Sequence, residues 1–364
     1  MSEAVAPESE YGEVRDEEQL DWPKLVAYLR GKLEGVDQPL TIKQFRGGHS
    51  NLTYLLRFGE KEWVVRRPPF GPLPVGGHDM AREYRVLSRL WEAYQPAPRA
   101  MLFSEDTSII GAPFFIMERR SGFVIKNREP LPDWLATRPE WLHKLSAGFI
   151  DAVADLHAVD YRKVGLDGLG KPAGFLERQT VNWMKRWEAA KTSEVPLMEK
   201  LGKWFVENIP PPQPPALIHN DFYLHNAMID PADPGHIVGV FDWEMSTIGD
   251  PLVDVGLALN YWREKDDPPE LLNAPRAINY TLLPGFFSRD DLIQRYAARS
   301  QRDVSNIYFY WAWAHWKNAT VGQQIYARYA RGQTTDPRFA DMGLSGQNGA
   351  IGAARVARRL GFKD

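Results

Sequence analysis

Three short apolar runs between residues 216 and 241 constrain the fold of this chain more than any other feature. The last two runs are joined by residues 230–235, whose sequence DPADPG is rich in turn-forming residues. Apolar runs separated by Pro, Gly and Asp are typical of an antiparallel hairpin. Because a hairpin brings its ends together, we expect Asn226 and Asp242 to lie side by side. Asp221 would lie on the loop that enters the first strand.

The polar residues around this hairpin form the pattern His219-x-Asp221-x₄-Asn226, followed beyond the turn by Asp242. Phosphoryl transfer requires a metal ion to neutralise charge and a group that orients the attacking hydroxyl. The spacing matches a kinase catalytic loop and its metal-binding aspartate. It predicts Asp221 as the catalytic residue and Asn226 and Asp242 as Mg²⁺ ligands. Turn residues that merely flank a hairpin are the alternative, which the full set of four disfavours.

Composition limits the classes of protein that need to be considered. The chain has 364 residues, 44% of them hydrophobic and 25% charged, and a net charge of −3, so nothing points to nucleic acid or a membrane. It has no cysteine, which excludes disulfides, thiolate metal sites and a cysteine nucleophile. Residues 1–18 are acidic and without an apolar signal core, so we expect a solvated tail and a cytoplasmic protein.

The motif residues His219–Asn226, Phe241–Glu244 and Gly249–Asp254 resemble the aminoglycoside phosphotransferase/choline kinase superfamily. Within this superfamily, the motif sequences are similar to those of the branch related to the kinase-like domains fused to some acyl-CoA dehydrogenases. That branch includes bacterial proteins, some of which are kinases for 4-hydroxyacyl-CoA thioesters. The likeness spans nearly the whole chain after about Leu20. It is specific for the superfamily and much less so for the substrate.

The resemblance implies an α+β, bilobal protein-kinase-like fold, with a small antiparallel β-sheet N-lobe and a larger, mainly helical C-lobe. After the tail, we expect a nucleotide-binding lobe over residues 19–118 and a catalytic and substrate lobe over residues 119–364. The run 109–117 indicates a buried strand. The resemblance places the hinge between the lobes directly after it, where the backbone near Met117, Glu118 and Arg119 would bind adenine.

Gly47 and Gly48 lie between two predicted strands, where backbone amides could approach phosphates. An ordinary hairpin turn would explain the same pair. The resemblance favours the first interpretation because it places the nucleotide-covering loop here. His49, Ser50 and Asn51 would then lie near the γ-phosphate.

Arg66 ends a predicted strand where kinases commonly carry a lysine that contacts the α- and β-phosphates. Arginine keeps the charge but binds with a different geometry. Arg67 is the competing candidate, since strand alternation turns one of the two inward, and a solvated strand end is the remaining alternative. Glu83, on the helix that follows, is the predicted partner of Arg66.

Three further residues near the motif are assigned supporting roles. His219 is expected to stabilise the catalytic loop by hydrogen bonding, and the resemblance implies that Asp254 braces this loop. His157 ends an apolar helical face and is interpreted as a packed structural histidine. Asn220 stands where relatives usually have glycine, which is a departure from the family pattern.

The acceptor is less constrained than the chemistry. Residues 289–364 carry twelve Arg or Lys against six Asp and no Glu, which argues against a polycationic aminoglycoside and for an anionic acceptor such as a CoA thioester. Trp311, Trp313 and Trp316 would form a wall for an acyl or adenine group. The alternative is that the arginines form a solvated surface or a homodimer face.

We therefore expect a phosphotransferase that uses Mg²⁺ and ATP to phosphorylate a hydroxyl of a small molecule, with a hydroxyacyl-CoA as the first candidate. An aminoglycoside or another small alcohol is the alternative acceptor. Two rival functions are a nucleotide-binding module with little catalysis, which the Arg66 and Asn220 departures favour, and a scaffold that uses the aromatic helices and the basic segment 355–363. Intact Asp221 and its metal-binding partners count against the first rival.

Overall fold

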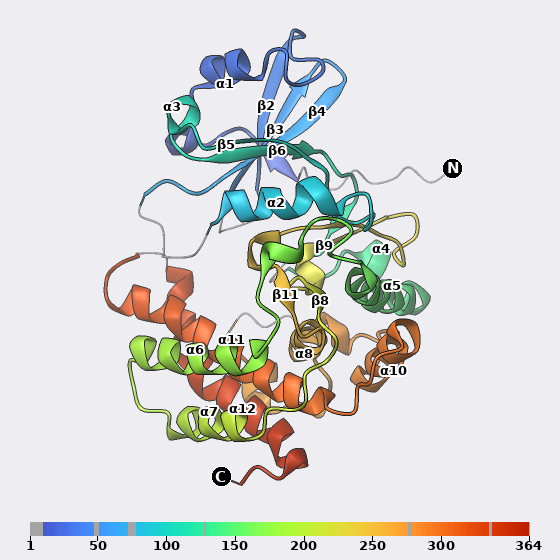
Figure 1. The fold of residues 1–364 in the computed structure, drawn as a ribbon, viewed down its shortest axis with the longest axis vertical. Coiled ribbons are helices and arrows are strands. Elements are labelled where there is room, and N and C mark those ends of the chain that lie inside the picture. The colour runs from blue at the N-terminus through green and yellow to red at the C-terminus, as the bar shows by residue number, and fades with distance from the viewer. Residues whose placement is uncertain are drawn as a thin grey trace. The chain divides into compact units, whose positions relative to one another are not determined.

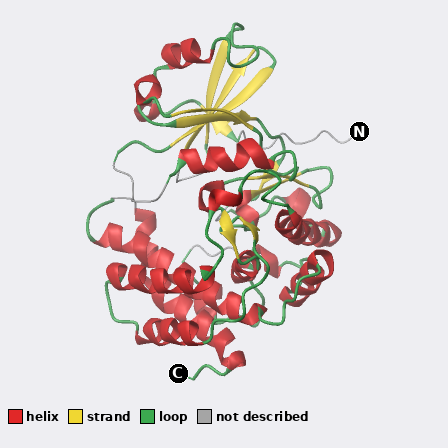
Figure 2. Ribbon diagram, in the orientation of Figure 1, coloured by secondary structure: helices red, strands yellow, loops and turns green. Residues whose placement is uncertain are grey.

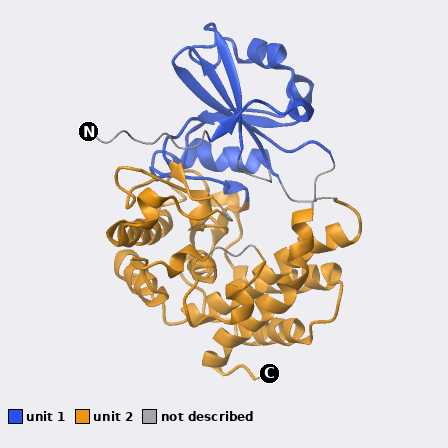
Figure 3. Cartoon of the chain, turned by 180° about the vertical axis from the view of Figure 1, so that it is seen from behind, with its two compact units in different colours: residues 1–122, 238–244 blue, residues 123–237, 245–364 orange. Residues whose placement is uncertain are grey.

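The chain divides into two compact units, residues 1–122 with 238–244 and residues 123–237 with 245–364 (Figure 3). The structure is a computed structural model that describes residues 10–46, 51–71, 78–126, 129–275, 279–334 and 337–363. Most strands belong to the first unit and most helices to the second, as Figures 2 and 3 show. This is the α+β, protein-kinase-like composition that the sequence predicts, with a small antiparallel sheet unit and a larger helical one.

The first unit is built on a six-stranded antiparallel sheet in the order β1-β2-β3-β4-β6-β5 (Figure 1). Its strands are β1 (Tyr11–Gly12), β2 (Leu40–Phe45), β3 (Leu52–Phe58), β4 (Lys61–Arg67), β5 (Ala100–Ser104) and β6 (Phe114–Glu118). The register places Arg66 opposite Thr53 on one side and Phe115 on the other. Arg66 therefore lies in the middle of the sheet, although it is charged.

Three helices cover this sheet: α1 (Trp22–Leu29), α2 (Met80–Leu90) and α3 (Thr107–Ile110). Helices α1 and α3 bury apolar side chains in the same core as strands β3, β4 and β6. Helix α2 packs against β5 and β6. Asp79 caps α2 by accepting a hydrogen bond from the Arg82 amide at 2.9 Å, which fixes where the helix begins. The buried face of α2 carries Glu83 among Met80, Val86, Leu87 and Leu90.

The amino-terminal segment differs from the prediction of a solvated tail over residues 10–18. Tyr11 and Gly12 pair with β2, and the Tyr11 ring lies edge-on to Phe45 at 6.0 Å. The carbonyl of Glu18 accepts a hydrogen bond from the Tyr54 hydroxyl at 2.8 Å. The acidic composition did not indicate this strand pairing, because one aromatic ring and a few backbone hydrogen bonds are enough to fix an edge strand. Residues 1–9 lie outside the described residues.

The second unit is mainly helical. Its helices are α4 (Asp133–Ala136), α5 (Pro139–Ala158), α6 (Phe175–Ala190), α7 (Pro196–Glu207), α8 (Leu252–Tyr261), α9 (Pro269–Leu272), α10 (Arg289–Ser300), α11 (Ile307–Ala330) and α12 (Ser345–Ala357). Its strands are β7 (Phe123–Val124), β8 (Ala216–Ile218), β9 (Ala227–Ile229) and β11 (Thr247–Gly249), while β10 (Ile237–Val240) crosses into the first unit. The 3₁₀ helices of the chain are η1 (Asp16–Glu18), η2 (Asp167–Leu169), η3 (Leu224–Asn226), η4 (Trp243–Met245), η5 (Tyr280–Leu282), η6 (Pro337–Leu344) and η7 (Arg358–Leu360).

Two small antiparallel pairs frame the segment between β8 and β9. Strand β8 pairs with β11, and β9 pairs with β7. After β9 the chain reverses in the predicted turn, where the Asp230 amide donates to the His236 carbonyl at 3.0 Å. The residues from His219 to Asn226 are thus a short loop held between two paired strands.

Helix α11 is the long central helix of this unit, and it approaches α8 closely. A Cβ on Gly256 of α8 would lie 2.5 Å from the Tyr310 carbonyl oxygen, so only glycine allows this approach. Fifteen residues of α11 are buried, and they occur all around the helix. None of the helices in the described part of the chain is long and apolar enough to cross a membrane.

Candidate functional site

The loop between β8 and β9 brings Asp221 and Asn226 together. The Asn226 side-chain amide donates to the Asp221 carbonyl at 2.9 Å and lies 3.3 Å from its carboxylate Oδ2. Helix η3 supplies the single turn that folds Asn226 back over Asp221. Since an amide ligates a cation through its oxygen, use of the nitrogen toward Asp221 is compatible with a metal-binding role for Asn226.

The backbone in front of Asp221 is fixed by a buried carboxylate. The two Asp254 oxygens accept from the His219 amide at 2.7 Å and the Asn220 amide at 2.6 Å. His157 Nε2 lies 3.2 Å from the same carboxylate, and its Nδ1 lies 2.8 Å from the Tyr296 hydroxyl. Asp254 therefore contacts the loop as the resemblance implies, and His157 is packed inside the unit as the sequence predicts.

Asn220 adopts a left-handed backbone conformation with φ of 64°. Among non-glycine residues, asparagine is one of those that tolerate this region best, which explains how it can replace the usual glycine. Its side-chain nitrogen lies 3.4 Å from the Met245 carbonyl. Its carbonyl oxygen accepts from Lys317 Nζ at 3.1 Å.

The contact between Lys317 and Asn220 was not predicted from the sequence. Lys317 lies on α11 and is only 4% exposed. Burial lowers the pKa of its ammonium, while the negative charges of Asp221 and Asp254 oppose that effect. The available signal was a single lysine inside an otherwise aromatic and apolar helical run, which a buried helix does not normally accept.

In the first unit, Arg66 pairs with Glu83, as the sequence predicts, and also with Asp242, which the sequence did not assign to it. Its Nε donates to Glu83 Oε2 at 2.9 Å, and its guanidinium also pairs with the carboxylate of Asp242. Arg67 is engaged elsewhere: it donates to the carbonyls of Pro68 and Ile110 at 2.9 and 3.0 Å. Strand alternation therefore turns Arg66, and not Arg67, toward the acids.

Asp242 is held at this position by its neighbour Trp243. The Trp243 indole is fully buried, packs edge-on against Tyr94 and donates to the Val240 carbonyl at 2.7 Å. The Val240 amide in turn donates to the Pro96 carbonyl at 2.8 Å. Asp242 itself has φ of 65°, the second left-handed residue of the motif.

The acids outnumber the bases around Arg66. Burial, together with the nearby charges of Asp242 and Glu244, raises the pKa of Glu83 to about 7, and Arg66 opposes this shift. Burial disfavours the charged form of Arg66, but the attraction of Glu83 and Asp242 outweighs it and raises the pKa of Arg66 above its usual value. Carboxylate oxygens are ligands that Mg²⁺ prefers, which is compatible with the predicted role of Asp242.

Of the predicted loop over the phosphates, the structure describes only Asn51. Asn51 is buried and donates to Glu244 Oε2 at 3.1 Å, and its amide oxygen lies 2.8 Å from His78 Nδ1. The other four residues of the predicted nucleotide-covering loop lie outside the described residues; they are Gly47, Gly48, His49 and Ser50. Their phosphate contacts stay a prediction.

The predicted hinge residues end β6. Met117 pairs with Val64 and is buried, while the Glu118 amide donates to the Arg99 carbonyl at 3.0 Å. The Glu118 amide is therefore already bonded, so any adenine contact in this segment would use another backbone group. The guanidinium of Arg119 pairs with Glu10.

The two predicted metal ligands, Asn226 and Asp242, fall in different units. Asp242 belongs to the first unit, whereas Asp221 and Asn226 belong to the second. The expectation that Asn226 and Asp242 lie side by side therefore stays a prediction. Within the described ranges, no three or more His, Asp or Glu side chains lie close enough together to bind a metal ion as a group. Magnesium at phosphoryl-transfer sites usually has one or two carboxylates plus phosphates and water, so no such cluster is needed.

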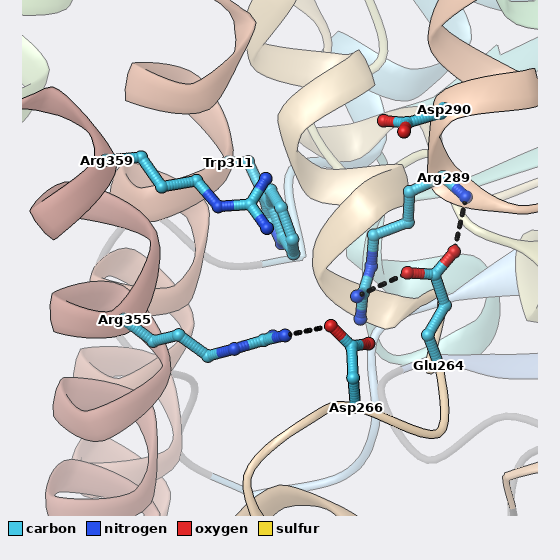
Figure 4. A pocket seen from close by; sticks show the side chains of 7 residues that line it. All are labelled: Glu264, Asp266, Arg289, Asp290, Trp311, Arg355 and Arg359. Atoms are coloured by element: carbon cyan, nitrogen blue, oxygen red, sulfur yellow. Dashed lines mark hydrogen bonds and ion pairs between the residues drawn. The ribbon is translucent and has the colours of Figure 1, made fainter.

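Part of the positive charge of the carboxyl-terminal segment is paired with acids from elsewhere in the chain. Among its described residues, ion pairs with such acids join Arg289 to Glu264 and Asp267, Arg295 to Asp151, Arg299 to Asp155, and Arg355 to Asp266 and Asp267. Figure 4 shows two of these pairs around a cavity of about 160 Å³. The excess of positive charge therefore supports an anionic acceptor less than the composition suggests.

Two of the three predicted wall tryptophans belong to the core. Trp313 donates to the Thr180 hydroxyl and Trp316 to the Met198 carbonyl, both at 3.0 Å, and each is about 1% exposed. Trp311 lines the cavity of Figure 4, where Arg289 lies 4.5 Å from its ring centre. The idea of a tryptophan wall is thus wrong for Trp313 and Trp316.

Known proteins resemble this chain over most of its length. It is 31% identical over 365 residues to acyl-CoA dehydrogenase family member 11 of Gallus gallus, covering 98% of this chain and 46% of that protein. The human protein of the same name is 31% identical, with 92% and 43% covered, and the probable acyl-CoA dehydrogenase IBR3 of Arabidopsis thaliana is 29% identical, with 81% and 37% covered. The chain thus spans less than half the length of these relatives.

Among solved structures, a Ralstonia eutropha protein provisionally assigned as an aminoglycoside phosphotransferase superposes with a TM-score of 0.79 and 28% identity, covering 94% of this chain and 99% of that one. An aminoglycoside phosphotransferase in complex with GDP and kanamycin has a TM-score of 0.57 and 14% identity, covering 90% and 98%, which shows a shared fold. A family model described as "Phosphotransferase enzyme family" matches residues 41–285. Since this match covers more than half of the chain and includes both the Asp221–Asn226 loop and the Arg66–Glu83 pair, the chain belongs to the phosphotransferase enzyme family.

Proposed function

We propose that this protein transfers the γ-phosphoryl group of Mg·ATP to a hydroxyl of a small molecule, and that the acceptor is a hydroxyacyl-CoA. The observation that carries the phosphotransferase assignment is the loop in which Asn226 is folded against Asp221. The proposed roles are those of the motif: Asp221 orients or deprotonates the acceptor hydroxyl, and Asn226 and Asp242 hold Mg²⁺. The metal would neutralise charge on the phosphates.

Arg66 is the proposed phosphate-binding cation. Its side chain is buried and held by Glu83, so the guanidinium is already oriented before any ligand binds. Asn51 is proposed at the same end of the site, and the four loop residues before it are proposed to cover the phosphates. Met117, Glu118 and Arg119 are proposed to lie at the adenine ring.

The acceptor proposal is supported by the surroundings of the catalytic loop. Tyr223, two residues after Asp221, stacks on Tyr261 with ring centres 4.5 Å apart, and Tyr261 is 40% exposed. The His225 ring lies edge-on to Tyr223 at 5.2 Å and is bonded to the Tyr280 hydroxyl at 2.7 Å, and burial lowers the pKa of His225 to about 4, so it is neutral near pH 7. An aromatic and neutral rim suits an acyl chain better than a polycation.

The names of the relatives point the same way. The proteins that match this chain over most of its length are called acyl-CoA dehydrogenase family members, which associates its relatives with acyl-CoA thioesters. The solved complexes with kanamycin and hygromycin B favour an aminoglycoside as the second candidate, although their 14% identity supports the fold alone. The acceptor class therefore needs a direct measurement.

The decisive experiment measures Mg·ATP consumption with a panel of acceptors: a 4-hydroxyacyl-CoA, free hydroxy acids, choline and an aminoglycoside. Asp221→Asn keeps the side-chain size but removes the proton acceptor, so turnover should fall by about 10³-fold or more while Mg·ATP affinity stays within a few fold. Asp233→Asn, in the exposed turn after β9, is the matched control and should behave like the wild type. Undiminished turnover in Asp221→Asn would refute the assignment.

A further inference from the structure

Lys317 occupies a position that packing alone does not explain. It lies on α11, the helix whose other side chains at this level are aromatic or small, and it is 4% exposed. Burying an ammonium is unfavourable unless it is paired and hydrogen-bonded, and an apolar side chain of the same length would pack here without that penalty. A buried lysine at such a position therefore calls for a specific interaction.

That interaction is with the residue immediately before the proposed base. Lys317 Nζ donates to the Asn220 carbonyl at 3.1 Å and lies 3.4 Å from the Asn220 side-chain oxygen. The Asn220 carbonyl is part of the peptide group that leads into Asp221. Fixing this oxygen sets the orientation of the peptide plane and hence the direction in which the Asp221 side chain leaves the backbone.

Two buried charges thus hold the loop from opposite ends of the same residue. Asp254 on α8 accepts from the Asn220 amide at 2.6 Å, while Lys317 on α11 donates to the Asn220 carbonyl. The close contact of the two helices at Gly256 and Tyr310 keeps these groups in register, because Tyr310 lies seven residues, or two helical turns, before Lys317. Both backbone groups of a residue in the left-handed conformation are therefore tied to side chains from rigid helices.

We propose that Lys317 is a positioning residue for phosphoryl transfer, which fixes the Asn220–Asp221 peptide group and supplies positive charge next to the Asp221 carboxylate. This role rests on the proposed function of Asp221. The charges that face the ammonium are Asp221 on the loop, Asp254 on α8 and Arg186 on α6, and the Trp183 ring of α6 lies 5.8 Å from Nζ. Asp221 and Asp254 favour the charged form of the lysine, whereas burial and Arg186 oppose it.

The test compares Lys317→Met, Lys317→Arg and the matched control Lys203→Met, which removes an exposed lysine from helix α7. Lys317→Met should lower kcat by about 100-fold, as expected for a displaced catalytic group, with the KM for Mg·ATP unchanged within threefold. Lys317→Arg keeps the charge and should recover a large part of kcat. Full activity in Lys317→Met beside an inactive Asp221→Asn would overturn the positioning role and leave the proposed function intact.

The pH profile separates positioning from packing. Because the pKa of Lys317 is lowered from 10.5, the charge is lost at a pH below 10.5, and wild-type kcat should fall there. In Lys317→Arg the charge persists, so this alkaline decline should disappear. If both variants lose activity equally and keep the wild-type pH profile, the loss arises from packing and the positioning role is wrong.

Amide hydrogen exchange tests the same proposal without any acceptor. The peptide covering residues 217–226 should exchange at least tenfold faster in Lys317→Met than in the wild type, and at the wild-type rate in Lys203→Met. Should no acceptor in the panel be phosphorylated, faster exchange would still support the fixing of the loop by Lys317. Unchanged exchange would refute it. If Lys317→Met does not fold, Lys317→Gln serves for the same measurement, because it also removes the charge that holds the Asn220 carbonyl.

Discussion

Replacing Asp254 by asparagine tests the internal support of the catalytic loop. The wild-type carboxylate is fully buried and accepts hydrogen bonds from the backbone amides of His219 and Asn220 at 2.7 and 2.6 Å. Asparagine has nearly the same shape, but only one of its two terminal atoms can accept. One backbone N–H must then face an NH₂ group, and the other loses its charged acceptor.

The magnitude follows from these two losses. A hydrogen bond to a charged group contributes about 1.5–3 kcal/mol, and a buried donor left unsatisfied costs about 1–3 kcal/mol. The asparagine needs less desolvation than the carboxylate, which offsets part of the loss, but Lys317 then loses one of its two acidic neighbours. We expect the free energy of unfolding to fall by about 3–4 kcal/mol in Asp254→Asn.

Urea denaturation followed by tryptophan fluorescence measures this difference, and kcat is read under conditions where the variant is folded. We expect kcat to fall at least tenfold, because the loop in front of Asp221 is no longer fixed. The control is Asp233→Asn, whose carboxylate forms an exposed ion pair with Lys144 at 3.2 Å and should contribute less than about 1 kcal/mol. A loss below 1 kcal/mol in Asp254→Asn with normal kcat would refute the reasoning.

Two further predictions concern packing and pH. In Gly256→Ala the new Cβ meets the Tyr310 backbone, so denaturation should show a loss of about 1–3 kcal/mol, whereas Gly202→Ala on α7 meets movable side chains at 3.1 Å and should change stability less. Equal stability of both variants would contradict this. The pKa of Glu83 is raised from 4.5 to about 7, so its stabilising contribution is complete below pH 4.5 and is lost as pH rises to 7. The free energy of unfolding of the wild type should therefore decline by about 3 kcal/mol across this range. In Glu83→Gln this decline should be flatter, which denaturation at a series of pH values measures. The same slope in both proteins would refute it.

The sequence predicts best what depends on neighbouring residues. Asp221 and Asn226 lie five residues apart, so one 3₁₀ turn is enough to bring them together, and the motif contains that information. The resemblance to kinases suggested Glu83 as the partner of Arg66, and the structure contains this pair. Strand alternation predicted that one of Arg66 and Arg67 turns inward, but it left open which of the two.

What the sequence could not predict depends on distant partners. Lys317 reaches a loop almost one hundred residues earlier, and a helix that is buried all around gives no direction for this lysine. The carboxyl-terminal arginines were counted as an excess because their acids, such as Asp151 and Asp155, lie on another helix far away in the chain. Charge counts within a segment ignore such pairing.

The ion pair between Arg66 and Asp242 has a consequence for the order in which ligands bind. While the guanidinium holds that carboxylate, a free cation must compete with it for the same oxygens. A phosphate group that attracts Arg66 would release Asp242, and a cation bound to Asp242 would release Arg66. By thermodynamic linkage each ligand should then strengthen the binding of the other by the same factor, so nucleotide and magnesium should bind as a cooperative pair.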